Sequence, residues 1–208
     1  MASKVFGFVG VESYDIAYYA ARTALGLGHS VLLVDGTVDH SVSCIYNGDI
    51  NGDIVDVNGV HILASDPSPG VFKGYEYVFV VTGFKTKILG MCDEIYMFTT
   101  LQKNHIKQLQ QIEVPDVPRF LVIRDRAACP ISTKGILEDL KRFDFMEEEV
   151  YELEDSDGDI ESKVMLHYTA RIKVSRLSAS VLAFVRHLFD TDATKKEIDR
   201  VWRSLQKG

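Results

Sequence analysis

The sequence predicts a doubly wound α/β fold, in which a mostly parallel, twisted sheet is flanked by helices. Apolar, β-branched runs of strand length alternate along the chain with segments whose apolar residues follow a helical period. This alternation is typical of parallel strands joined by crossover helices. The length of 208 residues fits one domain and is enough to bury a substantial core.

The first unit is a strand, a helix and a second strand. Residues 5–9 form an apolar run, and residues 14–27 have the apolar spacing of a helix. Gly28 then ends the helix as a left-handed cap, and residues 31–34 form the next strand, which Asp35 follows. These segments predict one right-handed βαβ unit.

An antiparallel hairpin is expected near residues 53–64. Alternating strands at 53–57 and 60–63 are separated only by Asn58-Gly59. This dipeptide favours a type I′ turn, because both of its residues tolerate a positive φ. The hairpin should lie on the sheet or at its edge.

The rest of the chain continues the alternation. The acidic run at 152–159 is interpreted as a solvated loop, and Thr194 with Glu197 fits a capping box at the start of the final helix. We expect an α/β domain over residues 1–190 and an amphipathic basic helix over 191–208. The other predicted elements are strands at 77–82, 94–99, 119–123 and 149–153 and helices at 102–112, 132–143 and 174–189.

Composition argues against several classes of function. A net charge of -7 does not suit a general nucleic-acid binder, which needs clustered Lys and Arg. Cys44, Cys92 and Cys129 are odd in number and far apart, and the six histidines lack ligand spacing, so no metal is expected. No run approaches the roughly 18 apolar residues of a membrane span. These features predict a cytoplasmic protein.

The turn between the first strand and the first helix has the layout of an anion site. It runs Phe6-Gly-Phe-Val-Gly10-Val-Glu12-Ser-Tyr-Asp15. Backbone N–H groups and the helix dipole converge at such a turn and attract phosphate. Glu12 would repel a triphosphate there.

This turn, with residues 29–37 after it, resembles the opening of the ParA/MinD family of P-loop ATPases. That family carries a KGGxGKTT phosphate loop, and its second strand ends in D-x-D. The resemblance continues through residues 59–65, 75–82 and 92–100, and it covers roughly residues 4–190. It implies a P-loop NTPase-like fold.

The charged positions of the family motif are replaced in this chain. The two lysines fall on Phe8 and Ser13, the magnesium-binding hydroxyl on Tyr14, and two further aspartates on Thr37 and Val81. Phosphoryl transfer depends on cations that stabilise the transferring group, so we do not expect ATP hydrolysis. We expect no cofactor.

A residual ATP or ADP site stays open, and so does a plain turn that binds nothing. The positions that would form such a residual site are Gly10, Ser13, Tyr14 and Asp35.

Within that family, the degraded motif is most similar to the CpaE/TadZ-like proteins of pilus assembly. The similarity implies a non-catalytic, homodimeric scaffold or localisation adaptor for a pilus or secretion apparatus. The alternative is a nucleotide- or NAD(P)-binding enzyme with an atypical phosphate loop, because residues 28–31 followed by Asp35 imitate a dinucleotide fold. Only Gly10 fits that motif, since Glu12 and Asp15 take the places of its other glycines.

Two segments are candidate interaction surfaces. The loop at 37–52 is expected to expose Ile45 and Tyr46. The final helix is expected to carry an apolar stripe amid basic residues, which would suit an anionic membrane surface. Packing of that stripe on the domain is the alternative that we favour. The stripe consists of Ile198, Val201, Trp202 and Leu205, and the basic residues are Lys195, Lys196, Arg200, Arg203 and Lys207.

Overall fold

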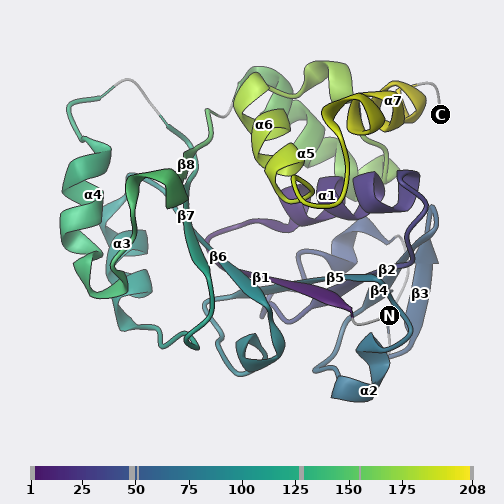
Figure 1. Cartoon of the computed structure of the whole chain (residues 1–208), viewed down its shortest axis with the longest axis horizontal. Coiled ribbons are helices and arrows are strands. Elements are labelled where there is room, and N and C mark those ends of the chain that lie inside the picture. Colours follow the sequence, from purple (N-terminus) through teal and green to yellow (C-terminus); the bar gives the residue numbers. More distant parts are fainter. Residues whose placement is uncertain (1–2, 47–49, 51, 127–128, 155, 207–208) are drawn as a thin grey trace.

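The computed structural model describes residues 3–46, 50, 52–126, 129–154 and 156–206. These residues form an eight-stranded sheet with helices on both faces (Figure 1). The strand order is β3-β4-β2-β5-β1-β6-β7-β8, with β3 and β4 antiparallel and the other neighbours parallel. The predicted fold class is confirmed. The strands are β1 (Lys4–Gly10), β2 (Val31–Asp35), β3 (Ile54–Val57), β4 (Val60–Leu63), β5 (Tyr77–Gly83), β6 (Glu94–Thr99), β7 (Arg119–Ile123) and β8 (Val150–Glu152).

Two helical layers cover the sheet. Helices α1, α5, α6 and α7 lie together on one face, while α3 and α4 pack on the other (Figure 1). Side chains of β1 alternate between these layers, with Phe6 and Phe8 facing α1 and Val5 and Val9 facing α3. The helices are α1 (Tyr14–Gly26), α2 (Pro69–Phe72), α3 (Lys103–Gln111), α4 (Thr133–Asp139), α5 (Asp157–Thr169), α6 (Ala179–His187) and α7 (Lys195–Leu205).

Aromatic rings fill the core beneath α1. Phe6 stacks on Phe79 with ring centroids 5.4 Å apart, and Phe8 lies 5.6 Å from Tyr96. Such pairs contribute about 0.5–1.5 kcal/mol each beyond the area that they bury. The strands at the centre of the sheet are therefore fixed firmly where their carboxyl ends carry the candidate site.

The hairpin forms as predicted. Asn58 and Gly59 have φ of 53° and 84°, and Val57 pairs with Val60 across the turn. The Oδ1 atom of Asp56 accepts a hydrogen bond from the Gly59 N–H at 3.1 Å. Positive φ at both central positions is the requirement of a type I′ turn, which Asn-Gly meets with little strain.

The interpretation of residues 152–159 as a solvated loop is wrong for its second half. Ser156 caps α5, since its hydroxyl accepts from the Asp159 N–H at 3.2 Å while the Asp159 carboxylate accepts from the Ser156 N–H at 2.9 Å. Asp159 is buried and also accepts from the Ser178 N–H at 2.8 Å. The acidic residues here serve a capping box. Asp155 lies outside the described residues.

Two predicted helices are shorter than their apolar periods. The helix expected over 132–143 is α4 followed by a 3-10 turn at Lys141–Phe143, and the one expected over 174–189 is a 3-10 turn at Val174–Arg176 followed by α6. In the second case the Ser178 hydroxyl accepts from the Val181 N–H and starts the helix anew. Helix periodicity does not by itself locate such an interruption.

The stripe on α7 is covered by the domain. Ile198, Val201 and Trp202 are buried in the hydrophobic cluster that includes α1, and Leu205 is partly buried against it. The Trp202 Nε1–H donates to the Thr23 hydroxyl at 3.1 Å, and Arg186 lies 4.9 Å from the indole ring. These apolar side chains are therefore not an exposed surface. The capping box from Thr194 to Glu197 is present as predicted, and residues 207–208 lie outside the described part.

Among the described residues, no helix combines the length and the apolar character that crossing a membrane requires.

Candidate functional site

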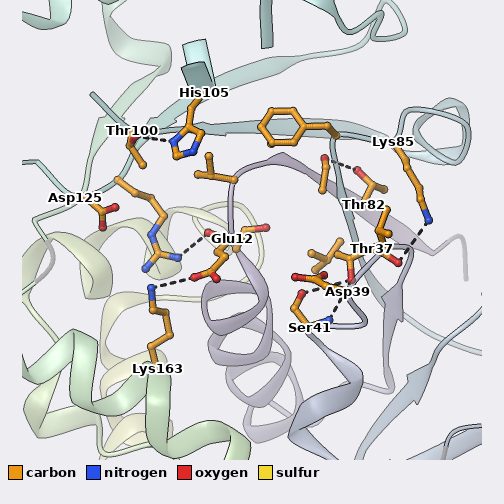
Figure 2. Close-up of a pocket in the computed structure, with 18 residues that line it drawn as sticks. Glu12, Thr37, Asp39, Ser41, Thr82, Lys85, Thr100, His105, Asp125 and Lys163 are labelled. Carbon is orange, nitrogen blue, oxygen red and sulfur yellow. Dashed lines mark hydrogen bonds and ion pairs between the residues drawn. The ribbon is translucent and has the colours of Figure 1, made fainter. Parts of the chain in front are cut away.

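A cavity of about 640 Å³ opens at the carboxyl edge of the sheet (Figure 2). It lies beyond the ends of β1, β2, β5, β6 and β7. The neighbouring strands β1 and β6 lead into helices on opposite faces, and such a reversal leaves a crevice where α/β proteins bind ligands. The lining residues are Gly10, Val11, Glu12, Ser13, Thr37, Val38, Asp39, Ser41, Val81, Thr82, Gly83, Phe84, Lys85, Thr100, His105, Arg124, Asp125 and Lys163.

Gly10 brings the first turn close against β6. Its φ is +116°, and a Cβ atom there would lie 2.0 Å from the carbonyl oxygen of Phe98. The next residue, Val11, donates its N–H to that same oxygen at 3.1 Å. Only glycine allows this approach, so Gly10 has a structural role that does not depend on a ligand.

A buried ion pair occupies the N-terminus of α1. Arg124, which follows β7, donates to both oxygens of Asp15 at 2.7 and 2.9 Å, and both side chains are 3 % exposed. The same guanidinium donates to the carbonyl oxygen of Glu12 at 2.9 Å. A cation near the first turn is thus engaged by this chain's own carboxylate. No sequence motif indicates this pair, because its residues are 109 positions apart.

Tyr14 points away from the cavity. Its ring stacks on His167 of α5 with centroids 4.7 Å apart, and its hydroxyl donates to the carbonyl oxygen of Lys163 at 3.4 Å. Burial, with a smaller contribution from Asp15, raises the pKa of this hydroxyl above its usual value. A neutral phenol packed between helices is not placed to hold a metal ion.

Glu12 lies in the turn between β1 and α1 (Figure 2). Its carboxylate is 3.1 Å from the Nζ atom of Lys163, a residue of α5. The neighbouring Ser13 precedes α1 and is buried, and its hydroxyl makes no capping hydrogen bond. The turn thus presents an acidic side chain directly before Ser13, the position at which the resembled family carries its second lysine.

Asp35 organises the loop that follows β2. Its Oδ1 atom accepts from the Thr37 N–H at 3.1 Å and hydroxyl at 2.6 Å, and its Oδ2 atom accepts from the Ser43 N–H and hydroxyl, both at 2.7 Å. The carboxylate is buried and is not among the residues that line the cavity. This is turn chemistry, in which an acidic side chain satisfies nearby backbone donors.

The expectation that Ile45 is exposed is wrong. Ile45 is 2 % exposed within a 3-10 turn, Ser43–Ile45, and Tyr46 is partly buried against the same core. The loop folds back over the α1 layer because Asp35 fixes its start, so its apolar side chains turn inward. Residues 47–49 and 51 lie outside the described part of the chain.

The remaining polar groups of the cavity balance one another. The Lys85 Nζ atom donates to the Thr37 carbonyl oxygen at 3.5 Å, and a hydrogen bond of 2.8 Å joins His105 Nδ1 to the Thr100 hydroxyl. No group of three or more His, Cys, Asp or Glu side chains in the described residues is arranged to hold a metal. The lining residues include three cations (Lys85, Arg124, Lys163) and three carboxylates (Glu12, Asp39, Asp125).

The four residues predicted to form a residual nucleotide site therefore separate. Gly10 and Ser13 line the cavity, whereas Tyr14 and Asp35 do not. The cations Lys85 and Lys163 and the ion pair of Arg124 escaped the sequence analysis, because each comes from a different element and none forms a local motif.

The arrangement of strands and helices matches the ParA/MinD type of P-loop NTPase fold. No protein-family model matches the sequence, and neither does any curated protein. Solved structures match over nearly the whole chain. At identities of 15 % or less they establish the fold and do not by themselves establish an activity.

Three of these structures illustrate the likeness. A ParA family ATPase from Chlorobium tepidum is 15 % identical over 90 % of this chain and 99 % of its own, with a TM-score of 0.61. The MinC:MinD cell division complex of Aquifex aeolicus matches with 11 % identity over 92 % and 98 %, and a TM-score of 0.65. A putative plasmid partition protein of Borrelia burgdorferi, bound to AMPPNP, matches with 14 % identity over 99 % and 97 %, and a TM-score of 0.51.

Proposed function

We propose that this protein is a ParA/MinD-like scaffold or localisation adaptor that does not hydrolyse ATP. The observation that carries the proposal is the buried pair of Arg124 and Asp15 at the N-terminus of α1. That helix end is where the resembled ATPases hold phosphate, and here a carboxylate of the chain itself lies against the guanidinium.

Rearrangement of the pair to admit a triphosphate is unfavourable. Separation of Arg124 from Asp15 would leave a buried carboxylate uncompensated, which destabilises a protein by about 3–5 kcal/mol. Glu12 adds repulsion at the mouth of the turn, and Ser13 has no cationic group to offset it. Both effects disfavour the binding of ATP at the first turn, and therefore its hydrolysis there.

Helix α5 offers a surface for the adaptor role. Ile160, Val164 and Tyr168 are 48, 50 and 71 % exposed and recur at four-residue spacing, which places them on one helix face. We propose that this face, called the α5 stripe below, contacts protein partners and a second copy of the chain. The resemblance to CpaE/TadZ-like proteins favours a pilus or secretion apparatus as the assembly served.

The catalytic part of the proposal is tested with a nucleotide panel. ATP and ADP, each with and without magnesium, are expected to leave the melting temperature unchanged, and ATP turnover should equal the buffer rate. A ParA-type ATPase serves as the positive control. ATP turnover that falls in Lys85→Ala or Lys163→Ala, at an unchanged melting temperature, would refute the proposal.

The adaptor part is tested in cells. A fluorescent fusion is expected to form discrete foci that become diffuse in the Val164→Glu variant. Met146 is also an exposed apolar residue, outside α5, so Met146→Glu is the matched control. Foci that persist in Val164→Glu, or that disperse equally in the control, would count against the α5 stripe.

The second candidate function is a nucleotide- or NAD(P)-binding enzyme. The observation that favours it is the cavity itself, which is large enough for part of a nucleotide and is lined by Lys85, His105 and Lys163. NAD and NADP belong in the same panel. A melting temperature raised by one of them and restored to baseline in Lys85→Ala would select this function over the adaptor.

A further inference from the structure

A second cavity lies on the far side of α1 from the sheet edge just described. Its volume is about 660 Å³, and it is enclosed by α1, α5, the segment at 170–173 and the last turn of α7. It shares no lining residue with the cavity at the carboxyl edge. Nothing in the proposed function uses it.

Two buried polar atoms of this cavity's lining residues have no hydrogen-bond partner in the described part of the chain. One is the hydroxyl oxygen of Ser162, a residue that is 3 % exposed, and the other is the Nε atom of Arg22. Buried polar groups in folded proteins almost always have a partner. Two such atoms at one cavity indicate a ligand that would accept their hydrogen bonds.

The side chains around this cavity carry an excess of positive charge, which favours an anionic ligand. Lys173 lies 3.6 Å from Glu161, and Arg176 approaches the same carboxylate at 3.9 Å, so the only acidic residue of the lining is already neutralised. Within the described residues, the guanidinium groups of Arg22 and Arg171 have no acidic partner. A positive excess of this kind stands out in a chain with a net charge of -7.

The wall that carries Arg171 is held firmly. The carbonyl oxygen of Ala170 accepts from the Tyr18 hydroxyl and from the Asn58 side-chain amide, both at 3.0 Å. The Arg171 N–H donates to the Thr169 hydroxyl at 3.3 Å. These hydrogen bonds join the end of α5 to α1 and to the hairpin turn. The wall is therefore ordered before a ligand binds, so binding costs little conformational entropy.

We propose that this cavity binds the phosphate group of a small organic molecule. A phosphate offers three strong acceptor oxygens, which match the Arg22 and Arg171 guanidinium groups and the Ser162 hydroxyl. The organic part would lie against Met165, Ile172 and Leu205, which form the apolar side of the cavity. The site is independent of the phosphate loop and of the α5 stripe.

The test measures melting temperature and calorimetric affinity with inorganic phosphate and with glycerol 3-phosphate, at an ionic strength held constant with sodium chloride. Both probes are expected to raise the melting temperature. Arg171→Gln and Arg22→Gln should each weaken binding about tenfold, as loss of a charged hydrogen bond does. Ser162→Ala should weaken it by a smaller factor.

Two features keep the test decisive. Arg171 is exposed, so its replacement leaves the fold intact even if Arg22→Gln does not. Lys107 is an exposed cation of α3, on the opposite face of the sheet, and Lys107→Gln should bind both probes as the parent does.

A second arm of the test, sedimentation with lipid vesicles, shows whether the phosphate belongs to a lipid headgroup or to a soluble molecule. Sedimentation with phosphatidylcholine vesicles that contain phosphatidic acid, lost in Arg171→Gln, would assign the phosphate to a lipid headgroup. Binding of glycerol 3-phosphate without sedimentation would assign it to a soluble molecule. Absence of binding in both arms, or binding that neither arginine variant weakens, would overturn the proposal.

Discussion

Helices α5 and α7 lie on the same face of the sheet (Figure 1), but their apolar faces differ in burial. The apolar face of α7 is buried against α1, with Trp202 at its centre. On α5, Ile160, Val164 and Tyr168 remain exposed. The sequence analysis considered an interaction surface on α7 but favoured packing of its stripe on the domain, and it expected a loop at the start of α5. Amphipathicity thus reveals that a helix has an apolar face, whereas the neighbouring elements decide whether that face is covered.

The largest expected effect is a loss of folding stability, which should differ between the buried apolar face of α7 and the exposed apolar face of α5. Trp202→Ala should lower the free energy of unfolding by about 3–5 kcal/mol, because it empties a buried site and removes the bond to Thr23. Tyr168→Ala on α5 should change it by no more than about 0.5 kcal/mol. Urea denaturation measures both. Similar losses of unfolding free energy in the two variants would contradict the difference in burial between the two helix faces.

The capping boxes extend the comparison to the helix N-termini. Asp159→Ala at α5 removes a buried carboxylate that accepts hydrogen bonds from the Ser156 and Ser178 N–H groups, and it should cost about 2–3 kcal/mol. Glu197→Ala at α7 removes an exposed carboxylate from the equivalent position of its capping box and should cost less. Thermal denaturation followed by circular dichroism ranks the two. The reverse order would contradict the burial of Asp159.

Self-association would distinguish the exposed face of α5 from the buried face of α7. If the α5 stripe joins two copies, the parent should elute as a dimer in size-exclusion chromatography with light scattering, and Val164→Glu should elute as a monomer. Its stability should change by less than about 0.5 kcal/mol, since the residue is half exposed. Arg200→Glu on the exposed side of α7 is the control and should stay dimeric. A monomeric parent would remove the second copy from the proposal.

The smallest effect is a pH dependence of α7. Hydrogen bonds from the Thr194 hydroxyl and N–H lower the pKa of Glu197 below its ordinary value of 4.5. A lowered pKa in the folded state contributes stability that is present above pH 4.5 and is lost as the pH falls through the folded value. Melting curves between about pH 7 and about pH 3 should show a smaller acid-induced loss in Glu197→Gln than in the parent. Equal losses would contradict this role.

Local signals account for what the sequence could predict. The strands alternate between two buried faces, and Asn58-Gly59 specifies its turn through the φ values that it tolerates. The cap of α5 was missed because Asp159 takes the place where Glu or Gln is usual and lies in a run of acids that reads as solvated. Neither the alternation nor the turn depends on distant contacts, which is why both were predictable.

The site depends on distant contacts and was mostly missed. Arg124 and Asp15 are 109 residues apart, and no spacing rule connects an arginine after one strand to an aspartate after another. Ile45 is buried because Asp35 folds its loop inward, a result that the polar composition of that loop conceals. Of the four residues predicted from the local motif, only Gly10 and Ser13 line the cavity.

The bond from the Tyr18 hydroxyl to the Ala170 carbonyl oxygen spans 152 residues. During synthesis on the ribosome, α1 emerges well before the helices that cover its outer side, because the first of those helices begins only at Asp157. The nascent domain therefore carries a bare aromatic and aliphatic surface until α5, α6 and α7 follow, and holding chaperones would find their binding sites there until α7 docks.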